Sequence, residues 1–213
     1  MSIFFRIFAG DNVKWLRYMI IGVTGGIGSG KSTILRAVAQ QGYAVYDCDK
    51  EAKRIIMEDA EVRKQMVELF GEGVYADGVY QTSYVAAQVF VYPEKLQQLN
   101  AIVHPAVTRD IAHWLTDKKV AFIESAILIT AGIDAFCDKV VAVIAPEKVR
   151  IQRVLQRAEQ QHHPLKEEDV RLRIRAQRGD YKSATIKLNN DGRRSIEELA
   201  QELIGYATSQ LAE

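Results

Sequence analysis

The sequence predicts an α/β protein with a parallel sheet flanked by helices, and three observations support that class. Five short segments rich in β-branched residues alternate with longer segments of helical periodicity. The first and fourth of these strand segments are almost continuously apolar, as strands buried on both faces of a parallel sheet are. A glycine-rich loop joins the first strand segment to the first helical one. Strands and helices that alternate in this way build doubly wound sheets.

The order of the elements predicts two insertions into the sheet. The expected strands cover 20–24, 43–47, 120–124, 139–145 and 184–188, and the expected helices cover 31–41, 50–70, 83–117, 146–161, 167–181 and 195–211. More than seventy residues separate the second strand from the third, far more than a crossover needs. We therefore expect a helical insertion at 50–118 and a smaller one at 148–181. The core then comprises 19–49, 119–147 and 182–213, and residues 1–18 form an appendage.

Composition excludes several classes of protein. The 213 residues are 48% hydrophobic and 26% charged, an ordinary globular balance, and the net charge is +1. No global field therefore recruits nucleic acid or an anionic membrane, and no apolar run approaches the ~20 residues of a membrane span. The two cysteines cannot form a disulfide framework, which suits a reducing cytoplasm. We expect a cytoplasmic protein with small-molecule partners, as a monomer or weak homo-oligomer.

The most specific motif lies at residues 25–32, which read G-G-I-G-S-G-K-S and match G-x-x-x-x-G-K-[ST] without a mismatch. Glycines let successive N–H groups point at phosphate oxygens, and the helix that follows adds its dipole. Lys31 would meet the β- and γ-phosphates, and the Ser32 hydroxyl would complete a Mg²⁺ shell. The alternative is a turn that only connects strand to helix. The predicted nucleotide-binding residues are Gly26, Ile27, Gly28, Ser29, Gly30, Lys31, Ser32 and Thr33.

A local basic excess follows the fourth predicted strand. Between residues 148 and 178 there are nine Lys and Arg against four Asp and Glu. Arg150, Arg153 and Arg157 recur at i, i+3 and i+7, which places them on one helical face. Such a face can close over transferring phosphates and balance their charge. The alternative is a basic face exposed to solvent.

Two carboxylates end the second predicted strand. Asp47 and Asp49 flank Cys48, and in an extended strand alternate side chains share one face. Ligands of open α/β sheets bind at the carboxyl ends of strands, so a carboxylate here could accept a proton from a substrate hydroxyl or hold Mg²⁺ through water. We expect Asp49 to be the catalytic one. The alternative is that one or both cap the helix that follows, as Asp does well.

Seven motifs in this order resemble the dephospho-coenzyme A kinase family from about Met19 to the C-terminus. They are T-G-G-I-G-S-G-K-S at 24–32, Y-D-C-D at 46–49, Arg63 with F-G at 70–71, L-N-A-I-V-H-P at 99–105, Q-R at 152–153 with Arg157, R-I at 173–174 with Gln177, and N-D-G at 190–192. The resemblance implies a P-loop fold in which Mg²⁺–ATP phosphorylates the ribose 3′-hydroxyl of dephospho-coenzyme A. It also implies that the insertion at 50–118 binds the acceptor and that 148–181 is a lid.

The resemblance assigns roles to individual residues. Lys31, Asp49 and Arg153 would be catalytic, Arg157 and Asn190 would contact the nucleotide, and the acceptor would meet Asp47, Arg63 and His104. For His104 the alternative is a turn histidine before Pro105 that supports the insertion.

Two positions depart from the family pattern. Thr130 stands where the family often has glutamate, although Glu124 precedes it, and Thr82 stands where the family has arginine.

Two rival functions share the phosphate loop. Another small-molecule kinase, for a nucleoside, a nucleoside monophosphate or shikimate, would differ in its acceptor. A regulatory nucleotide-binding module would show only slow hydrolysis, insensitive to any hydroxyl compound.

Overall fold

The computed structural model describes residues 19–177, 181 and 184–209, so the appendage predicted at 1–18 lies outside the described residues. The chain divides into two compact units. Residues 47–116 form one, and the segments before and after them form the other. The division of roles between a core, an acceptor-binding insertion and a lid stays a prediction.

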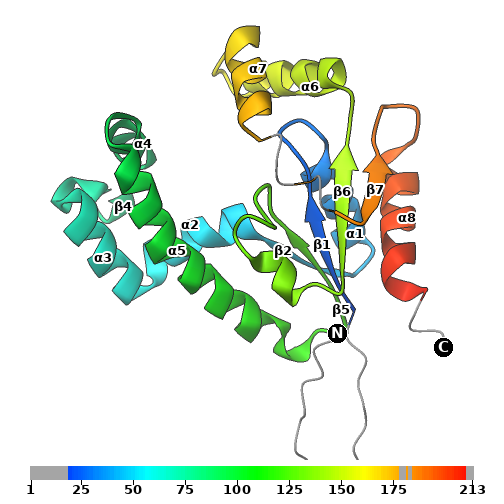
Figure 1. Ribbon diagram of the computed structural model, residues 1–213, viewed down its shortest axis with the longest axis horizontal. Helices are drawn as coiled ribbons and strands as arrows, with labels where there is room; N and C mark the ends of the chain where they lie inside the picture. Colours follow the sequence, from blue (N-terminus) through cyan, green and yellow to red (C-terminus); the bar gives the residue numbers. More distant parts are fainter. Residues whose placement is uncertain (1–18, 178–180, 182–183, 210–213) are drawn as a thin grey trace, which may run out of the picture. The chain divides into compact units, whose positions relative to one another are not determined.

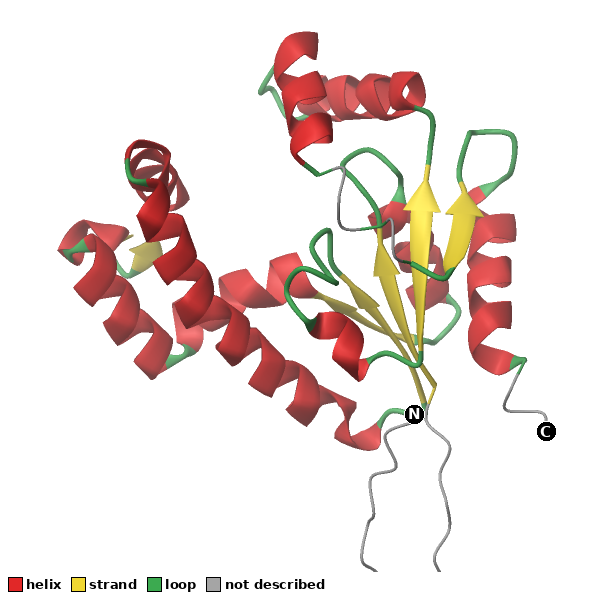
Figure 2. Cartoon of the chain, in the orientation of Figure 1, coloured by secondary structure: helices red, strands yellow, loops and turns green. Residues whose placement is uncertain are grey.

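The larger unit is built on a five-stranded sheet in the order β2-β5-β1-β6-β7. Its strands are β1 (Met19–Thr24), β2 (Ala44–Asp47), β5 (Val120–Glu124), β6 (Lys139–Ile144) and β7 (Ile186–Asn189). Strand β1 pairs in parallel with β5 and β6, and β6 pairs in parallel with β7. Figure 2 shows β6 and β7 side by side with their arrowheads at the same edge. The predicted fold class is therefore confirmed, with strand ends that differ from the predicted ones by at most two residues.

Helices α1 (Lys31–Gln40) and α8 (Ile196–Thr208) pack together against this sheet. Ile34, Leu35 and Val38 recur at helical spacing and give α1 one buried face. Ser195 and Glu198 form a capping box that satisfies free N–H groups at the start of α8. The core between helices and sheet includes Ile21, Val23, Phe122, Val141, Leu188, Leu199 and Leu203.

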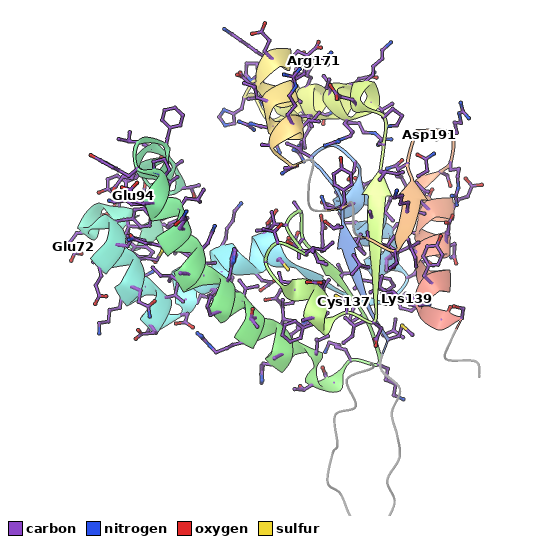
Figure 3. All side chains as sticks on the ribbon, in the orientation of Figure 1. Glu72, Glu94, Cys137, Lys139, Arg171 and Asp191 are labelled. Carbon is purple, nitrogen blue, oxygen red and sulfur yellow. The ribbon has the colours of Figure 1, made fainter. Side chains whose placement is uncertain are left out.

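Helices α6 (Glu147–Gln160) and α7 (Glu167–Ala176) form a pair beyond the carboxyl end of β6 (Figure 1). Ile151, Val154, Val170 and Ile174 make a small apolar cluster between them. The Arg171 guanidinium, labelled in Figure 3, donates to Glu147 at 2.9 Å and to Glu167 at 2.7 Å. The pair is thus joined by both an apolar interior and an exposed ion pair.

The smaller unit contains α2 (Cys48–Glu58), α3 (Ala60–Phe70), α4 (Thr82–Val91) and α5 (Pro93–Trp114). The prediction of one helix over 50–70 was wrong, because Asp59 interrupts it in an extended conformation (φ −75°, ψ 115°). Its carboxylate accepts hydrogen bonds from the N–H groups of Glu61 and Val62 and so caps α3. Pro93 begins α5 and likewise divides the helical region expected at 83–117.

A short hairpin, β3 (Tyr75–Ala76) and β4 (Val79–Tyr80), lies between α3 and α4. Asp77 and Gly78 both have positive φ at its turn, the conformation that an Asp-Gly pair adopts most readily. Residues 71–82, where the spacing of apolar residues predicts neither helix nor strand, thus contain a hairpin that the Asp-Gly pair signals locally. No helix in the described part of the chain is long and apolar enough to cross a membrane.

Candidate functional site

The glycine-rich loop joins β1, at the middle of the sheet, to the first turn of α1. Gly30 precedes the helix with φ 94°, and its carbonyl accepts from the N–H groups of Thr33 and Ile34. The loop therefore lies where the carboxyl end of a parallel strand meets a helix N-terminus. That combination provides directed N–H groups and a favourable dipole for an anion.

The outer side of the loop is held by residues far away in the sequence. The Arg150 Nε donates to the Ile27 carbonyl at 2.8 Å, and the Asn190 Nδ2 donates to the Ser29 carbonyl at 2.8 Å. Asn190, which directly follows β7, is buried. Both predicted nucleotide contacts, the loop and Asn190, thus lie together. In this structure, however, the Asn190 amide binds the loop backbone.

The predicted arginine face lies on α6 beside the same loop. Arg150 is buried, Arg153 half-buried and Arg157 exposed in the last turn of the helix. Arg153 donates to Oδ1 and the carbonyl of Asn190 at 3.1 and 3.2 Å, and its third contact is the Ser29 carbonyl at 3.4 Å. The structure therefore brings Arg153 to the phosphate loop, while Arg157 extends from the helix end into solvent.

Glu124 belongs to the candidate site, although no motif in the sequence assigns it a role there. It ends β5, the strand beside β1, and its Oε1 accepts a hydrogen bond from the Ser32 hydroxyl at 2.7 Å. The same oxygen lies 3.9 Å from the Lys31 ammonium. The available signal was a single carboxylate at the end of the apolar segment V-A-F-I-E, at the edge where ligands bind open sheets. Thr130, the position that departs from the family pattern, follows later in the connection to β6.

The expectation that Asp47 and Asp49 share one face of a strand was wrong. Strand β2 ends at Asp47, and α2 begins at Cys48, so the period of two does not extend to Asp49. The Asp47 carboxylate accepts the Lys50 N–H at 3.0 Å and caps α2. Asp49 lies in the first turn of the helix, where a negative charge is favoured by the dipole.

Three further positions named from the sequence lie within the smaller unit. The Arg63 guanidinium stacks 4.1 Å from the centre of the Tyr75 ring and donates to the Met57 carbonyl at 2.9 Å. His104 lies inside α5, not in a turn, and Pro105 is internal to the same helix. Burial lowers the pKa of the half-buried His104 imidazole. Thr82 is the first residue of α4.

The family model and the curated relatives both indicate one family. Residues 19–195 match the family model described as dephospho-CoA kinase. A dephospho-CoA kinase of Bacteroides fragilis is 33% identical over 87% of this chain and 91% of its own length. A solved structure from Thermus thermophilus has a TM-score of 0.74 at 33% identity, covering 91% of this chain and 98% of that one. A dephospho-CoA kinase from Campylobacter jejuni has a TM-score of 0.64 at 20% identity, over 90% and 98% of the chains, which shows a shared fold.

Proposed function

Because the chain belongs to the dephospho-CoA kinase family, we propose that it transfers the γ-phosphoryl group of Mg²⁺–ATP to the ribose 3′-hydroxyl of dephospho-CoA. The family's reaction is the ATP-dependent phosphorylation of dephospho-CoA, the last step of CoA synthesis. The observation that carries the proposal for this chain is the set formed by the phosphate loop, Lys31 and the Ser32–Glu124 pair.

The phosphate loop is proposed to bind the triphosphate of ATP. The loop ends at the start of α1, where the helix dipole favours negative charge. Lys31 adds a compact positive charge for the β- and γ-phosphates. Its neighbour Glu124, 3.9 Å away, orients the ammonium at the edge of the sheet.

The residues at this edge suit a magnesium ion. Mg²⁺ prefers oxygen ligands and keeps several waters, and it is commonly held by one or two protein groups together with substrate phosphates. Ser32 offers a hydroxyl as the direct ligand. Glu124, which accepts a 2.7 Å hydrogen bond from that hydroxyl, offers a carboxylate for a coordinated water. When bound, the ion neutralises charge on the β- and γ-phosphates.

Arg153 and Arg157 are proposed to balance charge on the transferring phosphoryl group. Phosphoryl transfer depends mainly on positioning and on stabilising charge spread over the equatorial oxygens. Arg153 already lies beside the loop through Ser29 and Asn190, and a guanidinium has five N–H donors to share between protein and phosphate. Helices α6 and α7 would then form the lid of the site.

Asp49 is proposed as the general base. The 3′-oxygen attacks the γ-phosphorus, the bond from that phosphorus to the bridging oxygen of ADP breaks, and the hydroxyl proton passes to the Asp49 carboxylate. The Asp47 carboxylate accepts the Lys50 N–H as a helix cap, which supports the choice of Asp49 as the base. Its position at the start of α2 follows the carboxyl end of β2.

The unit formed by residues 47–116 is proposed to bind the acceptor. It carries Asp47, Arg63 and His104, and the Arg63 cation lies 4.1 Å from the centre of the Tyr75 ring. Acceptor and nucleotide would then be bound by different units of the chain. Thr82 occupies the position where the family has an arginine, and the proposal assigns no other residue to that arginine's role.

We place the enzyme in the cytoplasm, where ATP is made and thiols stay reduced. Cys48 and Cys137 are both thiols and form no disulfide with each other. Cys137, labelled in Figure 3 near the start of β6, donates to the Ile133 carbonyl, and burial raises the pKa of its thiol to about 12. We also expect a monomer or a weak homo-oligomer, with ATP and dephospho-CoA as partners.

An ADP-release assay with a panel of hydroxyl acceptors tests the function. The purified chain with Mg²⁺–ATP should release ADP rapidly with dephospho-CoA and not with shikimate, a nucleoside or a nucleoside monophosphate. Mass spectrometry should find CoA as the product. The Lys31→Ala variant lacks the ammonium that would face the phosphates, so ADP release in its presence would come from contaminating kinases. Equal ADP release with every acceptor would instead identify a hydrolase or a regulatory module.

A further inference from the structure

The backbone of Ile27, inside the phosphate loop, is held from both sides by the α6–α7 pair. Its carbonyl accepts from Arg150 Nε of α6 at 2.8 Å, and its N–H donates to Gln177 Oε1, just beyond α7, at 2.7 Å. Its side chain packs on the apolar cluster between those two helices. One loop residue therefore makes three separate contacts with the helix pair.

Arg150, which makes the first of these contacts, is buried, with 6% of its surface exposed. Its Nη2 lies so near Gly26 that a Cβ there would stand 2.2 Å away. Its own carbonyl oxygen would lie 2.5 Å from a Cβ at Gly28, where φ is +77°. A side chain at Gly28 would therefore meet backbone atoms in a conformation that favours glycine, and a side chain at Gly26 would require the Arg150 guanidinium to move.

Packing alone does not account for an arginine at this position. Within the described residues, Arg150 Nη2 is buried without a hydrogen-bond partner. Burying a guanidinium with unsatisfied donors is costly, and an apolar side chain of similar size would avoid that cost. The one polar contact of this side chain that the structure defines is the Nε donation to Ile27. This hydrogen bond is therefore the interaction that an apolar side chain at position 150 could not make.

The hydrogen bond sets the direction of one peptide group. In a trans peptide the C=O of one residue and the N–H of the next point in opposite directions. Because Arg150 holds the Ile27 carbonyl toward α6, the Gly28 N–H points to the opposite side of the loop. We infer that Arg150 is a positioning residue, which keeps the Ile27–Gly28 peptide turned so that the Gly28 N–H meets a phosphate oxygen of the nucleotide. This rests on the nucleotide role proposed for the loop.

Two substitutions separate this role from a purely structural one. In Arg150→Gln, Nε2 stands the same number of bonds from Cα as the arginine Nε, so the donor to Ile27 is retained without the charge. In Arg150→Met the corresponding atom is a methyl group that cannot donate. Lys148→Met removes a positive charge from an exposed position of the same helix and serves as the control.

Each variant is titrated with Mg²⁺–ADP by calorimetry, its Tm is measured, and the Gly28 amide is followed by NMR. A hydrogen bond to a charged group is worth about 1.5–3 kcal/mol, or roughly 10- to 100-fold in Kd. We expect Arg150→Met to raise the Kd for ADP by at least about tenfold, with a Tm within about 4 °C of wild type. Arg150→Gln should recover most of the affinity. The Gly28 proton should move downfield on binding in wild type and Arg150→Gln, but not in Arg150→Met.

Wild-type affinity in Arg150→Met would overturn the inference. So would equal weakening in Arg150→Gln and Arg150→Met, which would assign the effect to the charge of the guanidinium. If Arg150→Met fails to fold, Arg150→Gln still tests the inference. A Gly28 amide proton that no longer moves downfield on ADP binding to Arg150→Gln, at an unchanged Tm, would contradict a positioning role for Arg150. Failure of the wild-type chain itself to bind ADP would instead refute the function proposed for the loop.

Discussion

The hydroxyl of Ser32, in the first turn of α1, donates a 2.7 Å hydrogen bond to the Glu124 carboxylate at the end of β5. This pair joins the last residue of the phosphate motif to the strand beside it. It orients the hydroxyl oxygen that we propose as a metal ligand. Replacing a group that orients a metal ligand typically lowers metal affinity or activity by about 10- to 100-fold.

Glu124→Gln tests this pair. The variant keeps the size of the side chain and an acceptor for Ser32, but it removes the negative charge beside Lys31. We expect the Mg²⁺ concentration that gives half-maximal rate to rise by roughly 10- to 100-fold. Initial rates measured against Mg²⁺ at saturating ATP give this value. An unchanged Mg²⁺ dependence would show that Glu124 only supports the fold.

Asp49→Asn tests the proposed base. The change keeps the shape of the side chain and removes its basicity, so we expect kcat to fall by about 10²-fold or more, the scale of a general base. The Kd for ATP should change little, because its contacts are assigned to the loop and lid. Single-turnover kinetics would separate the chemical step from product release. A kcat near wild type would leave the hydroxyl activated by positioning alone.

Asp47→Ala is the matched comparison for that variant. Its carboxylate caps α2 through the Lys50 N–H, so its loss should reduce the free energy of unfolding by about 1 kcal/mol. We expect a smaller loss of kcat than in Asp49→Asn. Urea unfolding and the same kinetic assay measure both effects. If Asp47→Ala abolished turnover while Asp49→Asn did not, the roles of the two carboxylates would be reversed.

Arg153→Ala should lower kcat or raise the Kd for ATP, because the guanidinium lies beside the loop, where it donates to Ser29 and Asn190. Arg153→Lys should recover only part of the activity, since an ammonium cannot reproduce the planar set of donors that contacts Asn190 twice. Steady-state kinetics and ATP titration check both variants. Kinetics equal to wild type in Arg153→Ala would favour a merely structural contact.

His104 should make stability depend on pH. Burial lowers the pKa of its imidazole below the usual value of about 6.5. The unfolded chain then binds a proton more readily, so stability falls as pH decreases from above about 6.5 through the folded pKa. We expect His104→Gln to lose less free energy of unfolding than wild type between about pH 7.5 and 5. Identical slopes in urea unfolding would show that His104 does not couple folding to protons.

Local signals were enough for the class of fold and for the phosphate loop. The spacing of apolar residues distinguishes strand from helix within a few residues, and the eight residues 25–32 carry their chemistry as a continuous string. The breaks in the smaller unit were also encoded locally, at Asp59 and at the Asp77–Gly78 turn. The apolar spacing around Asp59 favours one continuous helix, whereas the capping by its carboxylate, which divides the helix, is a short-range effect of a single side chain.

The contacts that shape the site depend instead on which elements become neighbours. Glu124 reaches Ser32 across 92 residues, Arg150 and Gln177 reach Ile27 across 123 and 150, and Asn190 reaches Ser29 across 161. These pairs exist because β5 and β6 flank β1, β7 follows β6, and α6 leaves the sheet beside the loop. The order of strands results from burying the whole apolar surface at once, which no short segment records. The amino-acid order therefore identified the loop that we propose to bind phosphate, and the packing of distant elements decided which groups hold that loop in place.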